Sequence, residues 1–99
     1  MPAYSLARLA ESDLKSLVRY TVKTWEKDQT RRYSQGLRDC FEQLAKNPLL
    51  GRGCDSIHPG LRRFEHGKHV VFYLSQPDAL LIVRVLHQQM MPAKPQFES

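Results

Sequence analysis

The chain has 99 residues, of which 41% are hydrophobic and 25% are charged. This length supports one hydrophobic core, so we expect a single domain over residues 1–99, and the composition argues against disorder. The formal net charge of +5 predicts attraction to an anionic partner such as nucleic acid or an acidic protein.

Membrane and disulfide-rich classes fit the sequence poorly. No apolar run is long enough to cross a bilayer and the first residues lack the basic start of a signal peptide, so we expect a cytoplasmic protein. Two cysteines at this spacing make neither a disulfide framework nor a CxxC metal site. We interpret Cys40 as a buried small residue and Cys54 as an idle surface thiol, and we expect no metal and no cofactor.

The first elements are a short strand and a helix. Tyr4 and Leu6 alternate with smaller residues, which predicts an edge strand within residues 2–6. From about Arg8 the apolar residues recur with a helical period. This amphipathic helix is expected to bury Leu14, Leu17, Val18, Thr21, Val22 and Trp25.

A second helix follows a tight connection. Asp28 is expected to cap its start and Pro48 to end it. Gly36 weakens a helix, and close approach to the first helix is one reason to accept it there. The predicted apolar face carries Tyr33, Leu37, Cys40, Phe41, Leu44 and Ala45. The two helices are expected to form an antiparallel hairpin.

The segment 61–87 contains three apolar runs separated by the turn signals His66-Gly67 and Gln76-Pro77-Asp78. This pattern predicts an antiparallel three-stranded meander. Residues 48–60, rich in glycine and proline, are expected to form a loop, and the residues after His87 a short irregular or weakly helical end. The predicted fold is α+β with the order β-α-α-β-β-β, in which the helical hairpin covers one face of the sheet.

Alternation along the meander divides the side chains between two faces if Phe64 pairs with His69 and Ser75 pairs with Leu80. We expect the helices to cover the face that carries Leu61, Val70, Phe72, Leu74, Leu81, Val83 and Val85, with Arg63 at its rim. The opposite face carries Phe64, Val71, Tyr73, Ile82 and Leu86 with Arg62, His69 and Arg84. Because this face mixes apolar and cationic groups, we interpret it as a binding surface. The alternative is that the residues after His87 fold back over it.

A set of short motifs resembles the ParE-type toxins of the RelE/ParE superfamily over nearly the whole chain. The motifs are Tyr4-x-Leu6, Ala10-x-x-Asp13-Leu14, Tyr20-Thr21, Trp25, Tyr33, Leu44-Ala45-x-x-Pro48, Gly51-Arg52, Gly60-Leu61-Arg62-Arg63, His69-Val70-Val71-Phe72-Tyr73 and Val85-Leu86-His87. The resemblance implies the toxin of a type II toxin–antitoxin system, neutralised by a cognate antitoxin. In the ParE branch the implied action is inhibition of DNA gyrase, and in the RelE branch ribosome-dependent cleavage of mRNA.

The residues favour binding over catalysis. The resemblance to RelE-like nucleases implies an Arg at the start of the central strand and an Arg with an aromatic hydroxyl after the last strand. This chain has His69 and the segment Gln88-Gln89-Met90-Met91 there. A replacement set of His69, His87, Tyr73 and Arg84 is chemically conceivable, but strand-end histidines are more often structural. We therefore predict no catalytic residues.

The predicted binding surface carries the partner contacts. The contact residues for antitoxin or target are Arg52, Arg62, Phe64, His69, Val71, Tyr73, Ile82, Arg84 and Leu86. The expected partners are a cognate antitoxin, in a hetero-oligomer, and DNA gyrase. We expect no membrane partner. A plain nucleic-acid-binding domain is the third possibility, but the chain offers no base-reading helix, so sequence-specific binding is not expected.

Overall fold

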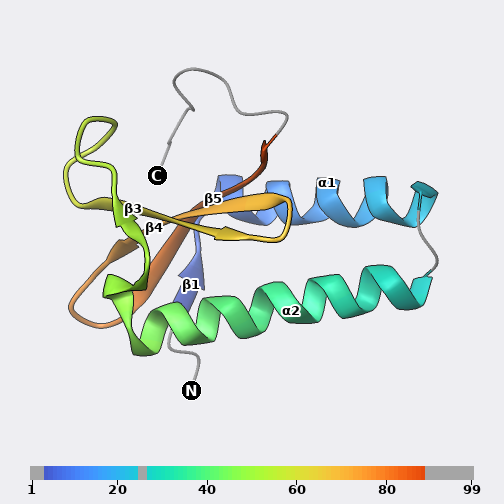
Figure 1. The fold of residues 1–99 in the computed structure, drawn as a ribbon, viewed down its shortest axis with the longest axis horizontal. Helices are drawn as coiled ribbons and strands as arrows, with labels where there is room; N and C mark the ends of the chain where they lie inside the picture. Colours follow the sequence, from blue (N-terminus) through green and yellow to red (C-terminus); the bar gives the residue numbers. More distant parts are fainter. Residues whose placement is uncertain (1–3, 25–26, 89–99) are drawn as a thin grey trace.

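The computed structural model describes residues 4–24 and 27–88, without the side chains of residues 21–24. Two long helices form an antiparallel hairpin beside a twisted sheet (Figure 1). The elements are β1 (Tyr4–Leu6), α1 (Arg8–Thr24), α2 (Lys27–Lys46), the 3-10 helix η1 (Pro48–Leu50), β2 (Arg52–Gly53), β3 (Leu61–His66), β4 (His69–Ser75) and β5 (Leu80–His87). The predicted α+β class and hairpin are confirmed.

The sheet has five strands in the order β1-β5-β4-β3-β2. The predicted first strand is confirmed at an edge, where β1 runs parallel to β5 and pairs Tyr4 with Leu80. The three strands of the predicted meander pair antiparallel as expected. The sequence did not indicate β2, which lies inside the expected loop and pairs Arg52 with Arg63. Two residues are too few to show an alternating pattern.

The turn between β3 and β4 is tighter than predicted. Phe64 pairs with Val71 instead of His69, and His66 pairs with His69 around a two-residue turn. Gly67 has a φ of 58°, a value that glycine adopts without a steric penalty and that such tight turns require. The shift of two residues leaves each side chain on its predicted face. The predicted pairing of Ser75 with Leu80 is confirmed.

A bulge interrupts the pairing of β4 with β5. Tyr73 pairs with Ile82, but Phe72 pairs with Arg84, so Val83 has no opposite residue. One extra residue exchanges the faces of all the residues that follow it. Val85 therefore joins the face of Val71, and Leu86 joins the face of Val70. The sequence predicted the reverse for both.

The helices cover the face that we expected to be open. The cluster between helices and sheet contains Ala10, Leu17, Leu37, Cys40, Phe41, Leu44, Val71, Tyr73, Leu80, Ile82 and Val85. The opposite face carries a second cluster of Cys54, Leu61, Val70, Phe72 and Val83, with Leu74, Leu81 and Leu86 packed against it. The prediction was wrong because both faces are rich in apolar residues, so alternation alone does not identify the face that the helices cover.

The helix predictions need smaller corrections. The α2 helix begins at Lys27, so Asp28 lies inside its first turn, where a carboxylate complements the positive end of the helix dipole. A Cβ at Gly36 would lie 3.4 Å from Nε2 of His66, so this glycine approaches β3 and not α1. Val18 is 41% exposed instead of buried. The predicted contacts of Thr21, Val22 and Trp25, and the end after Gln88, lie outside the described side chains.

Candidate functional site

Three of the predicted contact residues are part of the core. Val71, Tyr73 and Ile82 are each 0% exposed and pack beneath the helices. Phe64 is half-buried against the same cluster. Leu86 is half-buried on the opposite face of the sheet. The three buried side chains offer no surface to a partner, so the prediction of an open binding face is wrong for them.

The hydroxyl of Tyr73 holds the loop that follows α2. It donates to the carbonyl of Pro48 at 2.6 Å and accepts from the backbone N–H of Gly51 at 2.9 Å. A Cβ at Gly51 would overlap this hydroxyl and lie 2.6 Å from the carbonyl oxygen of Arg63. Glycine is therefore required there for close approach of the loop to the sheet. Tyr73 acts as a buried structural anchor.

Arg62 supports the same loop from β3. Its Nε and Nη2 donate to the carbonyl of Gly51 at 3.1 and 2.6 Å, and Nη2 also lies 3.5 Å from the carbonyl of Leu49. A guanidinium that satisfies these carbonyls stabilises the connection between η1 and β2. Arg62 is half-buried by this arrangement.

His69 belongs to a cluster of aromatic rings at the tight end of β3 and β4. Its Nδ1 lies 2.6 Å from the hydroxyl of Tyr33, and that hydroxyl donates to the carbonyl of His66 at 3.1 Å. Both contacts are satisfied when Nδ1–H donates to the hydroxyl. The ring of His87 meets that of His69 edge to face, with centroids 5.2 Å apart. His69 is only 8% exposed.

Burial controls the protonation of this cluster. Together with the charges of His87 and His66, which contribute less, it lowers the pKa of His69 from its ordinary value of 6.5 to about 4. Burial also raises the pKa of the Tyr33 hydroxyl. At neutral pH His69 is therefore an uncharged imidazole bonded to the neutral phenol of Tyr33. This uncharged pair packs at the end of β3 and β4.

Arg84 joins the sheet to α1. Its Nε and Nη2 donate to the two carboxylate oxygens of Asp13 at 2.8 and 3.0 Å, and the backbone N–H of Val85 donates to the same carboxylate at 3.0 Å. Both side chains are 15% exposed. The hydrogen bond to Asp13 raises the pKa of Arg84 above its ordinary value. The cation that we assigned to the open face is thus neutralised within the protein.

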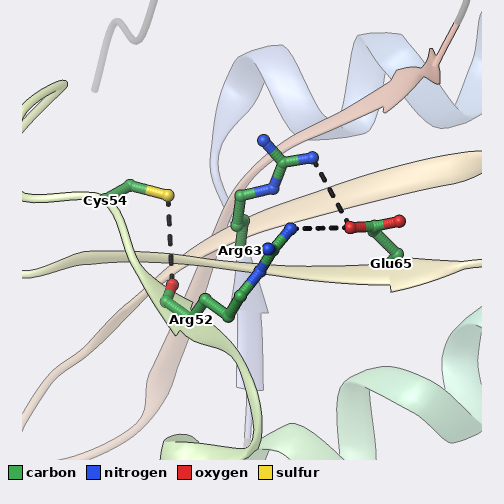
Figure 2. Close-up of polar contacts among 4 residues, drawn as sticks. All are labelled: Arg52, Cys54, Arg63 and Glu65. Atoms are coloured by element: carbon green, nitrogen blue, oxygen red, sulfur yellow. Dashed lines mark hydrogen bonds and ion pairs between the residues drawn. The ribbon is translucent and has the colours of Figure 1, made fainter.

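Arg52 keeps an exposed guanidinium. Its side chain is 73% exposed and its Nη2 lies 2.8 Å from Oε1 of Glu65, which also has Nη2 of Arg63 at 3.7 Å. Figure 2 shows the two guanidinium groups converging on this carboxylate. Cys54, beside them, is buried with its Sγ 3.9 Å from the carbonyl of Arg52. The interpretation of Cys54 as a surface thiol was therefore wrong.

Exposed apolar side chains flank Arg52 in the chain. Leu49 is 75% exposed, Leu50 47% and Ile57 38%. These residues were not predicted as contacts, because the whole segment 48–60 was interpreted as a loop. The signal was the pair of leucines directly after Pro48, since an apolar pair in a short turn has little core to enter. We call Leu49, Leu50, Arg52 and Ile57 the loop patch.

Within residues 4–24 and 27–88, no three His, Cys, Asp or Glu side chains lie where they could hold a metal ion. No helix of that part of the chain is long and apolar enough to cross a membrane.

Comparisons with known proteins agree with one another. Residues 4–92 match the family model described as the ParE toxin of the parDE type II toxin–antitoxin system. The chain is 36% identical over 88 residues to Toxin ParE1 of Mycobacterium tuberculosis (strain CDC 1551 / Oshkosh), covering 88% of this chain and 90% of that relative. It is 34% identical over 91 residues to Toxin ParE of Escherichia coli, covering 91% and 88%.

The fold is also similar to that of a solved structure. A chain of the chromosomal ParDE TA system from P. aeruginosa superposes with a TM-score of 0.72 at 19% identity, over 88% of this chain and 96% of that one. This likeness supports the fold assignment. The family match covers most of the sequence and both relatives exceed 30% identity. The chain therefore belongs to the ParE toxin family of type II toxin–antitoxin systems.

Proposed function

We propose that this ParE-family toxin inhibits DNA gyrase by binding to it, without hydrolytic chemistry of its own, and that a cognate antitoxin neutralises it. The observation that carries the proposal is the family match over residues 4–92. The name of the similar solved structure, a ParDE TA system, supports an antitoxin as partner. The cytoplasm, where gyrase and DNA are found, is the compartment this function requires.

The arrangement of the polar groups supports binding over nuclease chemistry. Three of the four residues that a replacement catalytic set would use are engaged within the protein. Tyr73 bonds to Pro48 and Gly51, and Arg84 bonds to Asp13. His69 is buried and bonded to Tyr33. A general acid or base must reach the substrate within hydrogen-bonding distance, and these groups are turned toward internal partners.

We assign the contact with a protein partner to the loop patch. Leu49 is the most exposed large apolar side chain among the described residues, and Arg52 places a cation beside it on the edge strand β2. Exposed apolar side chains next to an arginine are typical of protein interfaces. Arg52 is the member of the original contact set that keeps the largest described exposure.

Two measurements made side by side test the proposal. Purified toxin is passed over immobilised gyrase, and the same preparation is added to ribosomes translating a defined message. We expect saturable binding to gyrase, full-length message, and release from gyrase when the antitoxin is added. Cleaved message together with no binding to gyrase would replace the proposal with the RelE-like endonuclease.

A further inference from the structure

A groove runs between α1 and the first half of α2. Its volume is about 330 Å³. Its α2 residues belong to the N-terminal part of that helix, whereas the loop patch follows the C-terminal end. Its lining residues are Val18, Lys27, Thr30, Arg31, Ser34, Gln35 and Arg38. Six of these come from α2 at positions i, i+3, i+4, i+7, i+8 and i+11, which is one continuous face of a helix. At 1.5 Å per residue this face is about 16 Å long.

The chemistry of the lining suits an oxyanion. Lys27, Arg31 and Arg38 supply three cations, and none of the described residues that line the groove is a carboxylate. Asp39 lies outside the lining and accepts the side-chain amide of Gln35 at 3.1 Å. An anion in the groove would therefore meet cations and neutral polar groups, without a competing negative charge among the lining residues.

A buried hydroxyl adds an independent observation. Thr30 is 5% exposed, and its hydroxyl has no hydrogen-bond partner in the described part of the chain. Buried hydroxyl groups normally have a partner. Thr30 is also the fourth residue of α2, so its side chain lies in the first turn, where the positive end of the helix dipole favours an anion.

The residue types indicate which oxyanion the groove receives. Lysine, arginine, threonine, serine, glutamine and a helix N-terminus are the groups that contact phosphate oxygens in nucleic-acid complexes. A docking groove for a protein segment would present an apolar centre with aromatic side chains. Among the described residues of this lining, Val18 is the one apolar residue. A phosphate backbone therefore fits the groove better than an acidic peptide does.

We infer that the groove between α1 and α2 binds the phosphate backbone of DNA without reading its sequence. Arg31 and Arg38 contact phosphate oxygens with their guanidinium groups, and Lys27 adds a third charge. The hydroxyl of Thr30, which lines the groove and has no partner among the described residues, donates to the same phosphate. The inference is tested without gyrase and without antitoxin, so its failure and the failure of the proposed function are separate outcomes.

The first test removes one hydroxyl and no charge. Binding of the full chain to a short labelled DNA duplex is measured by fluorescence anisotropy for the wild type, Thr30→Val and Thr30→Ser. We expect Thr30→Val to weaken binding roughly ten- to a hundredfold, as for loss of a hydrogen bond to a charged group, and Thr30→Ser to bind like the wild type. The melting temperature of Thr30→Val should be equal or higher because valine has the same shape and no unpaired hydroxyl. Equal affinity of Thr30→Val and wild type would overturn the inference.

The second test compares two pairs of cations. Arg31→Gln/Arg38→Gln removes two charges from the groove, and Lys15→Gln/Arg19→Gln removes two exposed charges from α1 outside it. We expect the groove variant to reduce the slope of log affinity against log salt by about 2, and the control to leave it unchanged. Equal slopes for the two variants would mean that net charge alone attracts DNA. A glutamate-rich peptide that binds in place of DNA, and loses binding in Thr30→Val, would make the groove a protein-docking site. Either result overturns the inference.

Discussion

The carboxylate of Asp13 on α1 accepts two hydrogen bonds from the guanidinium of Arg84 on β5, residues that lie 71 positions apart in the sequence. The same carboxylate accepts the backbone N–H of Val85. One side chain thus connects the first helix to the last strand next to the bulge. This contact explains why a cation predicted for the surface lies against α1.

Replacing Asp13 with Asn should destabilise the fold. The substitution keeps the size of the side chain and leaves Arg84, 15% exposed, without its counter-charge. Removing one partner of a largely buried ion pair costs roughly 3 kcal/mol, and we expect this loss in the free energy of unfolding measured with urea. Glu11→Gln is the matched control, because Glu11 is an exposed carboxylate on the same helix. Equal effects of the two substitutions would show that the pair adds little stability.

Stability should depend on pH through His69. Its pKa is about 4 in the folded protein against 6.5 ordinarily, so below pH 6.5 the unfolded chain takes up a proton that the folded chain does not. The free energy of unfolding is therefore constant above about pH 6.5 and falls as the pH decreases toward 4, by roughly 3 kcal/mol in total. Urea unfolding between pH 4 and 8 measures this.

Two histidine variants isolate that effect. His69→Asn should remove most of the slope between pH 6.5 and 4, because asparagine does not titrate there. His58→Asn changes an exposed histidine and should leave the slope unchanged. A wild-type slope that persists in His69→Asn would assign the pH dependence to other groups.

Two glycines near β2 should respond differently to alanine. A Cβ at Gly51 would collide with the hydroxyl of Tyr73 and the carbonyl of Arg63, whereas a Cβ at Gly53 has nothing within 4 Å. We expect Gly51→Ala to lower the free energy of unfolding by about 2–3 kcal/mol, as for overpacking, and Gly53→Ala to change it by less than about 0.5 kcal/mol. Thermal unfolding of the two variants gives the comparison. Similar melting temperatures would mean that the loop moves away at little cost.

The loop patch should lose partner binding without losing stability. Leu49→Asp and Arg52→Glu change side chains that are 75% and 73% exposed, so both variants should melt within a few degrees of the wild type. If the patch contacts the antitoxin, each should weaken its binding at least tenfold in calorimetry, the size of effect expected at an interface anchor. Lys68→Glu, at the distant β3–β4 turn, is the control. Loss of binding only in Lys68→Glu would move the interface to that end of the sheet.

The sequence predicted the main helices and strands and most of the assignment of side chains to the two faces of the sheet. These features depend on the period of the apolar residues and on the residues at turns, and both are local signals. The bulge beside Phe72 could not be predicted, because nothing in the alternation of residues along the strand marks Val83 as the residue without an opposite partner. Which face of the sheet the helices cover also depends on tertiary contacts that the sequence pattern does not show. The hydroxyl of Tyr73 indicated a surface residue until its partners Pro48 and Gly51 were known.

The candidate site was predicted less well than the fold, and for a related reason. Cationic residues were assigned to a surface because of their type. Arg62 instead donates to the carbonyl of Gly51, and Arg84 donates to the carboxylate of Asp13. Arg52 keeps a side chain that is 73% exposed, on the strand β2 that pairs with β3. Which cations are free depends on contacts between residues far apart in the chain.

Supercoiling of relaxed plasmid by purified gyrase, titrated with the toxin in the absence and presence of its antitoxin, tests the central claim most directly. A binding toxin predicts inhibition that increases with toxin concentration until gyrase is saturated and that is reversed by an equivalent of antitoxin. Full supercoiling at toxin concentrations well above that of gyrase, with a correctly folded toxin, would contradict the account.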